Sequence, residues 1–346
     1  MRVPNIQLHT SPHIHAADTT AQIMRNVVYA LLPIAGFSVW QFGLSALALI
    51  ITVTLSCLFT ERVFSNQGNT LGDWSAVITG ILLALTLPPG FPLWMGVVAG
   101  VVGIALGKSL FGGLGMNVMN PALIGRAFVQ AAFPVSITTW TPGFFEGRFT
   151  SFIPTTLTLP FTIPPNTNAW VESLNVDGFS GATPLAVQKF EGVQAPLLDM
   201  FTGMSSGSAG ETSALLILVC GLYLAVRRFM DWRIPVIVLA SSALFAGVFW
   251  LYDPAQYPDP LFVLFSGGLM LGAWFMASDM VASPVTTLGV VIYASLIGLI
   301  TVVIRLFGGL TEGVMYAILL ANAASPLIEQ VTQPRVFGSR GRKEGA

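Results

Sequence analysis

A short segment of small residues carries the hydroxyl group with the clearest chemical potential in this chain. It reads Asp-Gly-Phe-Ser-Gly-Ala-Thr-Pro-Leu over residues 177–185, with Thr183 near its end. The small residues before the threonine are Gly178, Ser180, Gly181 and Ala182. They would leave the Thr183 side chain exposed, so that a modifying enzyme could attach a phosphoester to its hydroxyl, and Pro184 favours an extended backbone at Thr183. Considered alone, such a short segment of small residues favours an ordinary turn.

Four polar side chains within or beside apolar runs are further candidates. Arg126 lies inside the run 121–133, where a charge is costly unless it is paired or faces a cavity. It could hold an anionic group, and the alternative is a side chain that extends to the inner interface. Asp279 follows the eighth apolar run and could accept a hydrogen bond or bind a cation, or could only cap a turn. Asn120 and Asn322 lie where prolines accompany the fifth and tenth runs.

The histidines and cysteines do not form a recognisable metal site. His13 and His15 have a spacing that suits a metal in an exposed strand, with His9 close by, but no cysteine or carboxylate cluster accompanies them, which favours a solvated segment. Cys57 and Cys220 lie inside apolar runs and are predicted to be small buried side chains rather than disulfide or iron–sulfur ligands. The sequence contains no catalytic triad, phosphate-binding loop or dinucleotide fingerprint, so NAD and ATP are not expected to bind through a standard motif.

The composition indicates an integral membrane protein. Of the 346 residues, 54% are hydrophobic and 9% are charged, whereas soluble domains are about 25% charged. Nothing in this composition supports nucleic-acid binding. The first 22 residues are polar and precede an apolar run typical of a retained span, so no cleavable signal peptide is expected and the N-terminus is predicted to stay in the cytoplasm.

Ten apolar runs predict ten transmembrane helices. They are 23–40, 44–59, 74–87, 93–110, 121–133, 213–226, 234–251, 261–277, 285–304 and 313–328. Several are shorter than the about 20 residues that a straight crossing requires. We therefore expect an all-α polytopic membrane protein with a cytoplasmic N-terminal segment, five helices, an extracytoplasmic segment, five more helices and a cytoplasmic tail. The predicted bounds of these regions are 1–22, 23–133, 134–212, 213–328 and 329–346.

The placement of lysine and arginine predicts the orientation. With the N-terminus inside, eleven basic residues fall on the inner side: Arg2, Arg25, Arg62, Lys108, Arg227, Arg228, Arg233, Arg335, Arg340, Arg342 and Lys343. Three fall outside, namely Arg148, Lys189 and Arg305, and Arg126 lies within a span. Because cytoplasmic loops are enriched in basic residues, both termini are predicted to lie inside and segment 134–212, with Thr183, outside. That segment is expected to fold against the membrane face.

Short matches suggest that the two sets of five helices are repeats. Phe-Gly-Gly-Leu follows the fourth run at 111–114 and the ninth run at 307–310. Thr-Gly-Ile-Leu-Leu at 79–83 corresponds to Gly-Gly-Leu-Met-Leu at 267–271. An odd number of spans per copy would invert the second copy relative to the first and favour a binding site between the copies. Chance similarity is the alternative.

Interruptions of the apolar runs form a related pattern. Runs three and eight, and runs five and ten, are short or broken, near Pro88, Asp279, Asn120 and Asn322. Backbone groups freed by such breaks cannot face lipid, so they suggest a cavity that holds a ligand or an ion path. Proline kinks packed against neighbouring helices are the alternative.

The segment around Thr183 resembles the covalent flavin attachment motif of the RnfD and NqrB families of bacterial redox-driven ion pumps. The matching residues are Ser-Gly-Ala-Thr-Pro-Leu at 180–185. The resemblance covers essentially the whole chain and includes residues 11–13, 111–125, 307–310, 320–322, 326–328 and 333–338. The N-terminal region is short for NqrB, so the resemblance favours RnfD.

This resemblance implies that a separate flavin transferase links FMN through its phosphate to the Thr183 hydroxyl on the extracytoplasmic side. Asp177, Ser180, Gly181 and Ala182 would flank the attachment site. We predict that Arg126 and Asn120 contact a flavin and that Asp279 and Asn322 lie on an ion path. The related families also contain an inverted five-plus-five repeat, and a second, noncovalent flavin such as riboflavin has been associated with them.

The implied function is that of one component of a bacterial inner-membrane complex. Such a complex exchanges electrons between ferredoxin and NAD and couples this flow to movement of Na⁺ or H⁺. Partner membrane, iron–sulfur and flavin subunits would supply the nucleotide and iron–sulfur chemistry, so this chain alone would lack a complete active site. A secondary transporter or channel for a small polar solute is the alternative, because inverted repeats with broken helices also form transporters. A purely structural membrane anchor is a third interpretation.

Overall fold

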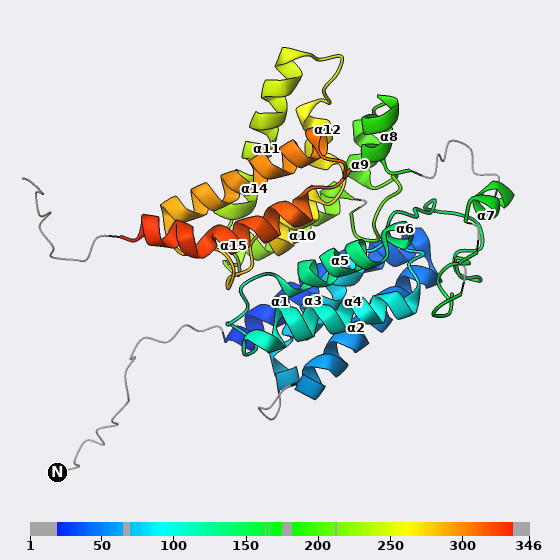
Figure 1. Ribbon diagram of the computed structural model, residues 1–346, viewed down its shortest axis with the longest axis horizontal. Helices are drawn as coiled ribbons and strands as arrows, with labels where there is room; N and C mark the ends of the chain where they lie inside the picture. The colour runs from blue at the N-terminus through cyan, green and yellow to red at the C-terminus, as the bar shows by residue number, and fades with distance from the viewer. Residues whose placement is uncertain are drawn as a thin grey trace, which may run out of the picture.

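Helices make up the regular structure of the chain (Figure 1). The computed structural model describes residues 19–64, 70–162, 164–165, 167–174, 182–211 and 213–334, and no β-strand occurs in these ranges. The α-helices are α1 (Thr20–Phe42), α2 (Leu44–Phe64), α3 (Ser75–Leu85), α4 (Leu93–Gly107), α5 (Pro121–Ala132), α6 (Pro134–Ile137), α7 (Thr167–Ser173), α8 (Pro184–Glu191), α9 (Leu197–Thr202), α10 (Ala214–Val226), α11 (Arg233–Tyr252), α12 (Pro260–Phe265), α13 (Leu269–Leu271), α14 (Thr287–Phe307) and α15 (Val314–Thr332). The predicted segment with His9, His13 and His15 lies outside the described residues.

Six helical stretches within the described ranges are long and apolar enough to span a membrane. They are α1, α2, α4 with the turn after it (Leu93–Phe111), α11, α14 and α15. Each of the ten predicted runs contains helix, but runs three, five, six and eight contain only shorter helices. The structure therefore confirms an all-α fold with several helices suited to a membrane. Cys57 and Cys220 are buried and free, as predicted.

The helices form two groups that lie side by side (Figure 1). In the first group α4 packs against α2 and α5, and in the second group α14 packs against α11 and α15. Across the boundary, α10 packs against α1, and α15 packs against α5. One apolar core joins the groups and contains the fully buried side chains of Leu31, Leu83, Tyr293 and Ile318. In Figure 1 the start of α1 and the end of α15 lie at the left, whereas α8 and α9 lie toward the right.

Two of the predicted interruptions are present. The third run is helical only to Leu85, and the eighth is divided into α12, α13 and a π-helical segment, Gly272–Met276. Gly267 adopts φ +59° between α12 and α13, a conformation that favours glycine. The free carbonyls at the end of α3 accept hydrogen bonds from a later loop: Gly210 N donates to Leu85 O at 2.7 Å, and Ala209 N donates to Leu87 O at 3.0 Å.

The other two predicted interruptions take different forms. The fifth run begins at Asn120, which caps α5, with Pro121 in the first turn where a missing N–H is tolerated. The tenth run is not interrupted, and the prediction of a break near Asn322 is wrong. The helix α15 continues through Pro326, although proline removes one hydrogen bond of the helix. The helix α15 packs against α14.

The described part of the segment between the two groups folds against the ends of the first helices. Ile153 N donates to Ser45 Oγ at 2.8 Å, and Thr155 Oγ1 donates to Gly90 O at 2.6 Å. The turn between α1 and α2 lies directly against residue 148 of this segment, because a Cβ at Gly43 would lie 1.9 Å from Arg148 O. These contacts hold residues 148–155 over the helix ends.

Close contact between α4 and α5 depends on glycine. A Cβ at Gly125 would lie 2.6 Å from Ala99 O, whereas nothing lies within 4 Å of a Cβ at Gly36 in α1. We expect Gly125→Ala to destabilise the protein by about 1–3 kcal/mol through overpacking. Gly36→Ala should be neutral or stabilising by up to about 1 kcal/mol, because alanine is the better helix former. The midpoints of thermal unfolding in detergent test this pair, and equal midpoints would contradict the assigned contact.

Candidate functional site

Thr183 caps the N-terminus of α8. Its Oγ1 accepts a hydrogen bond from Ala186 N at 3.3 Å, and its φ of −76° and ψ of 157° are extended, as Pro184 predicted. The residue is only 4% exposed, so the expectation of an exposed hydroxyl is wrong for this conformation. The reason is that the hydroxyl turns back over the first turn of α8 and satisfies one of its free N–H groups. Asp177, Ser180 and Gly181 lie outside the described residues.

Ala182 lies between two cavities. One has a volume of about 500 Å³ and includes Phe144 in its wall. The other has a volume of about 370 Å³ and is lined by Arg126, Trp140 and Phe190, among others. The chain next to Thr183 therefore borders open space with aromatic side chains and one guanidinium group.

Arg126 is buried within α5 and forms two ion pairs. Its Nη1 donates to Glu211 Oε1 at 3.0 Å, and its Nη2 donates to Glu312 Oε2. Glu211 precedes α10 and Glu312 precedes α15, so this one guanidinium connects the two groups of helices. The predicted pairing is present, and the side chain does not extend to the inner interface. Its two carboxylate partners were not anticipated from the sequence.

Glu211 is the more enclosed of the two carboxylates. Its Oε2 is buried and accepts no hydrogen bond of normal geometry from the described residues, although the Ser208 hydroxyl lies close enough to the carboxyl group to lower its pKa. The carboxylate covers Gly268, where a Cβ would lie 2.5 Å from Oε1. Burial and, next, the charge of Glu312 raise the pKa of Glu211, against the opposing effects of Arg126 and Ser208. The carboxyl group therefore keeps a proton above the usual carboxyl range.

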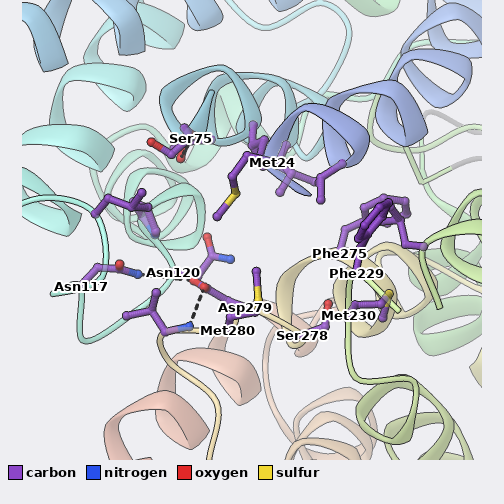
Figure 2. Close-up of a pocket in the computed structure, with 18 of the residues that line it drawn as sticks. Met24, Ser75, Asn117, Asn120, Phe229, Met230, Phe275, Ser278, Asp279 and Met280 are labelled. Atoms are coloured by element: carbon purple, nitrogen blue, oxygen red, sulfur yellow. Dashed lines mark hydrogen bonds between the residues drawn. The ribbon is translucent and has the colours of Figure 1, made fainter. Parts of the chain in front are cut away.

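A second region of interest is the cavity between the two groups at the end where α1 begins (Figure 2). Asn120 Oδ1 accepts a hydrogen bond from Ala122 N at 3.0 Å, and Asn120 Nδ2 donates to Met276 O at 3.3 Å. One amide thus caps α5 and holds the π-helical segment of the other group. Figure 2 shows polar side chains gathered on one wall and aromatic side chains on another: Asn117, Asn120 and Asp279, and Phe229 and Phe275.

Asp279 faces this inner cavity and also caps its own turn. Its Oδ1 accepts a hydrogen bond from Val281 N at 3.1 Å, and its Oδ2 accepts one from Asn117 Nδ2 at 3.4 Å. Burial raises the pKa of Asp279. The turn-capping role and the hydrogen-bonding role considered from the sequence are therefore both present.

Asn322 lies apart from the inner cavity, in the middle of α15. It is 1% exposed, and its Oδ1 accepts a hydrogen bond from the Tyr293 hydroxyl at 2.6 Å. Its Nδ2 has no hydrogen-bond partner among the described residues. No direct contact between Asn322 and Asp279 occurs among the described residues, but the Tyr293 hydroxyl also donates to Ala277 O at 3.2 Å, two residues before Asp279.

A largely buried ionic cluster borders the same cavity. Lys108 Nζ donates to Glu61 Oε1 at 2.5 Å and to Ser75 Oγ, and lies 3.9 Å from Asp73 Oδ2. Lys108 and Glu61 are both buried. This cluster joins the ends of α2 and α4 to the start of α3.

Comparison with known proteins supplies the family. The profile of the NQR2, RnfD, RnfE family matches residues 7–338. The chain belongs to this family. It is 43% identical over 341 residues to the D subunit of the Na⁺-translocating ferredoxin:NAD⁺ oxidoreductase complex of Acetobacterium woodii, with 96% of each chain covered. It is 37% identical over 347 residues to the D subunit of the proton-translocating ferredoxin:NAD⁺ oxidoreductase complex of Clostridium ljungdahlii, again with 96% of each chain covered.

A third NQR2, RnfD, RnfE family relative is the D subunit of the ion-translocating oxidoreductase complex of Alcanivorax borkumensis. The identity is 37% over 349 residues, with 97% of this chain and 98% of the relative covered. The resemblance to RnfD inferred from the sequence is thereby confirmed. The first two relatives are named for different ions, so family membership alone does not identify a transported ion.

Sequence reasoning missed the carboxylates and the lysine that pair inside this family member. Glu61, Lys108, Glu211 and Glu312 are buried or nearly so in ion pairs. The available signal was their position at the ends of apolar runs, where a charged group needs a partner. Their partners are distant in sequence: Arg126 is 85 residues from Glu211 and 186 from Glu312.

Lys189 fastens α8 to α14. Its Nζ donates to Arg305 O and Leu310 O, each at 2.9 Å, and to Gly308 O. These carbonyls lie at and beyond the end of α14, where they have no helical partner. The helix that begins at Thr183 is therefore attached to the second group of the NQR2, RnfD, RnfE fold through one ammonium group.

Proposed function

We propose that this chain is the RnfD-type membrane component of an ion-translocating ferredoxin:NAD⁺ oxidoreductase complex in the bacterial inner membrane. The observation that carries the proposal is the similarity, over nearly the full length of both chains, to proteins named as that component. In such a complex, partner membrane, iron–sulfur and flavin subunits exchange electrons with ferredoxin and NAD, and electron flow is coupled to movement of an ion. This chain contributes membrane helices and a flavin site.

The flavin site is FMN joined through its phosphate to Thr183 by a flavin transferase. Three features of the chain support this assignment. The threonine begins a helix whose free N–H groups favour a phosphate. Ala182 borders two cavities, and Trp140 and Phe190 offer aromatic surfaces to a ring. Arg126 offers positive charge at the edge of the second cavity, although both of its Nη atoms are engaged by carboxylates.

When bound, FMN supplies one- and two-electron transfer, and the chain supplies position and electrostatic environment. Attachment requires the Thr183 hydroxyl to leave its hydrogen bond with Ala186 N and become accessible. The phosphoester oxygens then replace the hydroxyl as acceptors for the N–H groups of α8. Asp177, Ser180, Gly181 and Ala182 flank the attachment in this proposal.

Thr183→Ala tests the assignment. The variant should assemble with the complex, since loss of a helix cap costs about 1 kcal/mol, but should lose all covalent flavin. Flavin fluorescence of the denatured chain on a gel, and the mass of the Thr183 peptide, measure this loss. Thr138→Ala is the matched control, because Thr138 lines the adjacent cavity, and it should retain the flavin. Fluorescence of the denatured Thr183→Ala chain at the wild-type level would exclude Thr183.

A second, noncovalent flavin such as riboflavin belongs, in this proposal, to the cavity between the two groups of helices, whose volume of about 120 Å³ must enlarge to admit the ring. Its aromatic wall and the amides of Asn117 and Asn120 suit a ring with polar edges (Figure 2). Asp279 in the same wall, and Asn322 within α15, remain candidates for the ion path. The two asparagines of the cavity then serve the flavin, and Asp279 serves the ion.

The ten spans form two inverted repeats, with both termini in the cytoplasm and Thr183 outside. The equivalent packing of α2, α4 and α5 and of α11, α14 and α15 supports the repeats. The broken third element of each group supports them as well. The start of α1 and the end of α15 at one end of Figure 1 support an even number of crossings. The excess of basic residues supports the orientation.

A further inference from the structure

The contacts around Glu211 leave one carboxylate in excess. Arg126 is the guanidinium within ion-pair distance of Glu211 and Glu312, and one positive charge balances one of the two. The other charged group acting on them is Arg305 in α14, which acts at longer range. Its Nη atoms donate to Val263 O at 2.7 Å and Ser266 O at 3.0 Å, so its charge compensates the end of α12.

A small cavity lies against Glu211. Its volume of about 20 Å³ is enough for one water molecule, and it lies between the end of α3 and the start of α13. Thr86, which caps α3, and Gly268, which precedes α13, line its wall. Most other lining side chains are aliphatic or methionine: Leu123, Leu271, Met276, Val314, Met315 and Ile318. A hard metal cation prefers six or more oxygen ligands, and this wall offers few.

Arg126 and Glu312 lie between the cavity beside Glu211 and the larger cavity beside Ala182. Both residues line the cavity of about 20 Å³ and also the cavity of about 370 Å³ that borders Ala182. Glu312 is the more exposed carboxylate, with 14% of its side chain accessible against 3% for Glu211. The Arg126–Glu312 ion pair therefore lies between Glu211 and the larger cavity.

We propose that the Arg126–Glu211–Glu312 cluster binds one proton, held on Glu211 Oε2. A hydronium ion of the solvent is the donor: one of its O–H bonds breaks, an O–H bond forms at Oε2, and water is left. The cluster thereby changes from one net negative charge to none. Glu211 Oε1 retains its hydrogen bond from Arg126 throughout. The proton is released past Glu312 into the cavity of about 370 Å³. The role of this proton in ion transfer rests on the function proposed above, whereas its binding does not.

Infrared difference spectroscopy of the purified complex tests this site. Spectra recorded over a pH series in choline chloride should contain the C=O band of a protonated, buried carboxylic acid at neutral pH, shifted in D₂O. Glu211→Gln should remove one such band. Glu61→Gln is the matched control, because Glu61 is an equally buried carboxylate paired with Lys108, and it should leave this band in place.

Glu312→Gln provides an independent variant. Removal of the neighbouring carboxylate leaves Glu211 alone with Arg126, so the midpoint at which the band disappears should move to lower pH by about one unit or more. This variant decides the question if Glu211→Gln fails to assemble. An unchanged band in Glu211→Gln, or an unchanged midpoint in Glu312→Gln, would overturn the proposal.

Addition of sodium ions tests whether the cluster binds Na⁺ in place of a proton. If NaCl, but not choline chloride, abolishes the band at neutral pH, the cluster binds Na⁺ and the proton assignment is wrong. The flavin assignment is separate, because it depends on the mass of the Thr183 peptide. Failure of the infrared test therefore does not contradict the flavin assignment, and failure of the peptide-mass test does not contradict proton binding.

Discussion

Replacement of Arg126 by methionine is expected to destabilise the protein by about 3–5 kcal/mol, because two buried carboxylates lose their shared countercharge. Glu211 and Glu312 then remain close together inside the protein, and the enclosed Oε2 of Glu211 gains no new donor. The midpoint of thermal unfolding of the complex in detergent should fall, and little assembled complex should be recovered from membranes.

The triple variant Arg126→Met, Glu211→Gln and Glu312→Gln separates charge from packing. A buried ionic cluster can often be replaced by neutral groups of similar volume without loss of stability, so the triple variant should recover most of the wild-type midpoint. Arg62→Met, at an exposed position in α2, should change stability by no more than about 0.5 kcal/mol. A triple variant as unstable as Arg126→Met would show that the guanidinium acts through packing.

Lys108→Met should have an effect of similar size, about 3–5 kcal/mol, at the opposite end of the helices. The substitution leaves Glu61 buried without its ammonium partner, and Glu61 Oε2 already lacks a hydrogen bond among the described residues. Ser75 Oγ also loses its donor, which loosens the start of α3. Thermal unfolding in detergent measures the loss.

The double variant Lys108→Met and Glu61→Gln should be more stable than Lys108→Met alone, since no unpaired charge remains buried. Arg25→Met is the surface control for this end, because Arg25 is exposed in α1. If the single and double variants unfold at the same temperature, the attraction between Lys108 and Glu61 does not contribute, and the hydrogen bond to Ser75 becomes the explanation.

Local features of the fold were predictable from the sequence. The apolar runs located the longer apolar helices, Pro184 predicted the extended backbone of Thr183, and prolines indicated the end of α3. The eighth run was expected to break near Asp279, whereas it divides earlier, near Gly267. These features depend on residues near one another in the chain. The interruption expected at Asn322 failed because packing along α14 outweighs the loss of one hydrogen bond at Pro326.

The ionic site itself could be predicted only in part. The sequence indicated that Arg126 needs a partner, but a partner 85 residues away follows from how the loop at 209–210 caps α3, which no local pattern encodes. The burial of Thr183 was missed for a related reason. Its hydroxyl was judged by the size of its neighbours, whereas the start of α8 and the packing around it decide its exposure.

The attachment of Lys189 to the end of α14 has a mechanical consequence. Three carbonyl oxygens accept hydrogen bonds from the Lys189 ammonium group, so α8 cannot move away from α14 without breaking these bonds or displacing the last turn of α14. That turn carries Arg305, whose guanidinium grips the end of α12. Thr183, α14 and α12 are therefore connected through hydrogen bonds. A displacement of Thr183 is expected to shift the end of α12, where the eighth run divides.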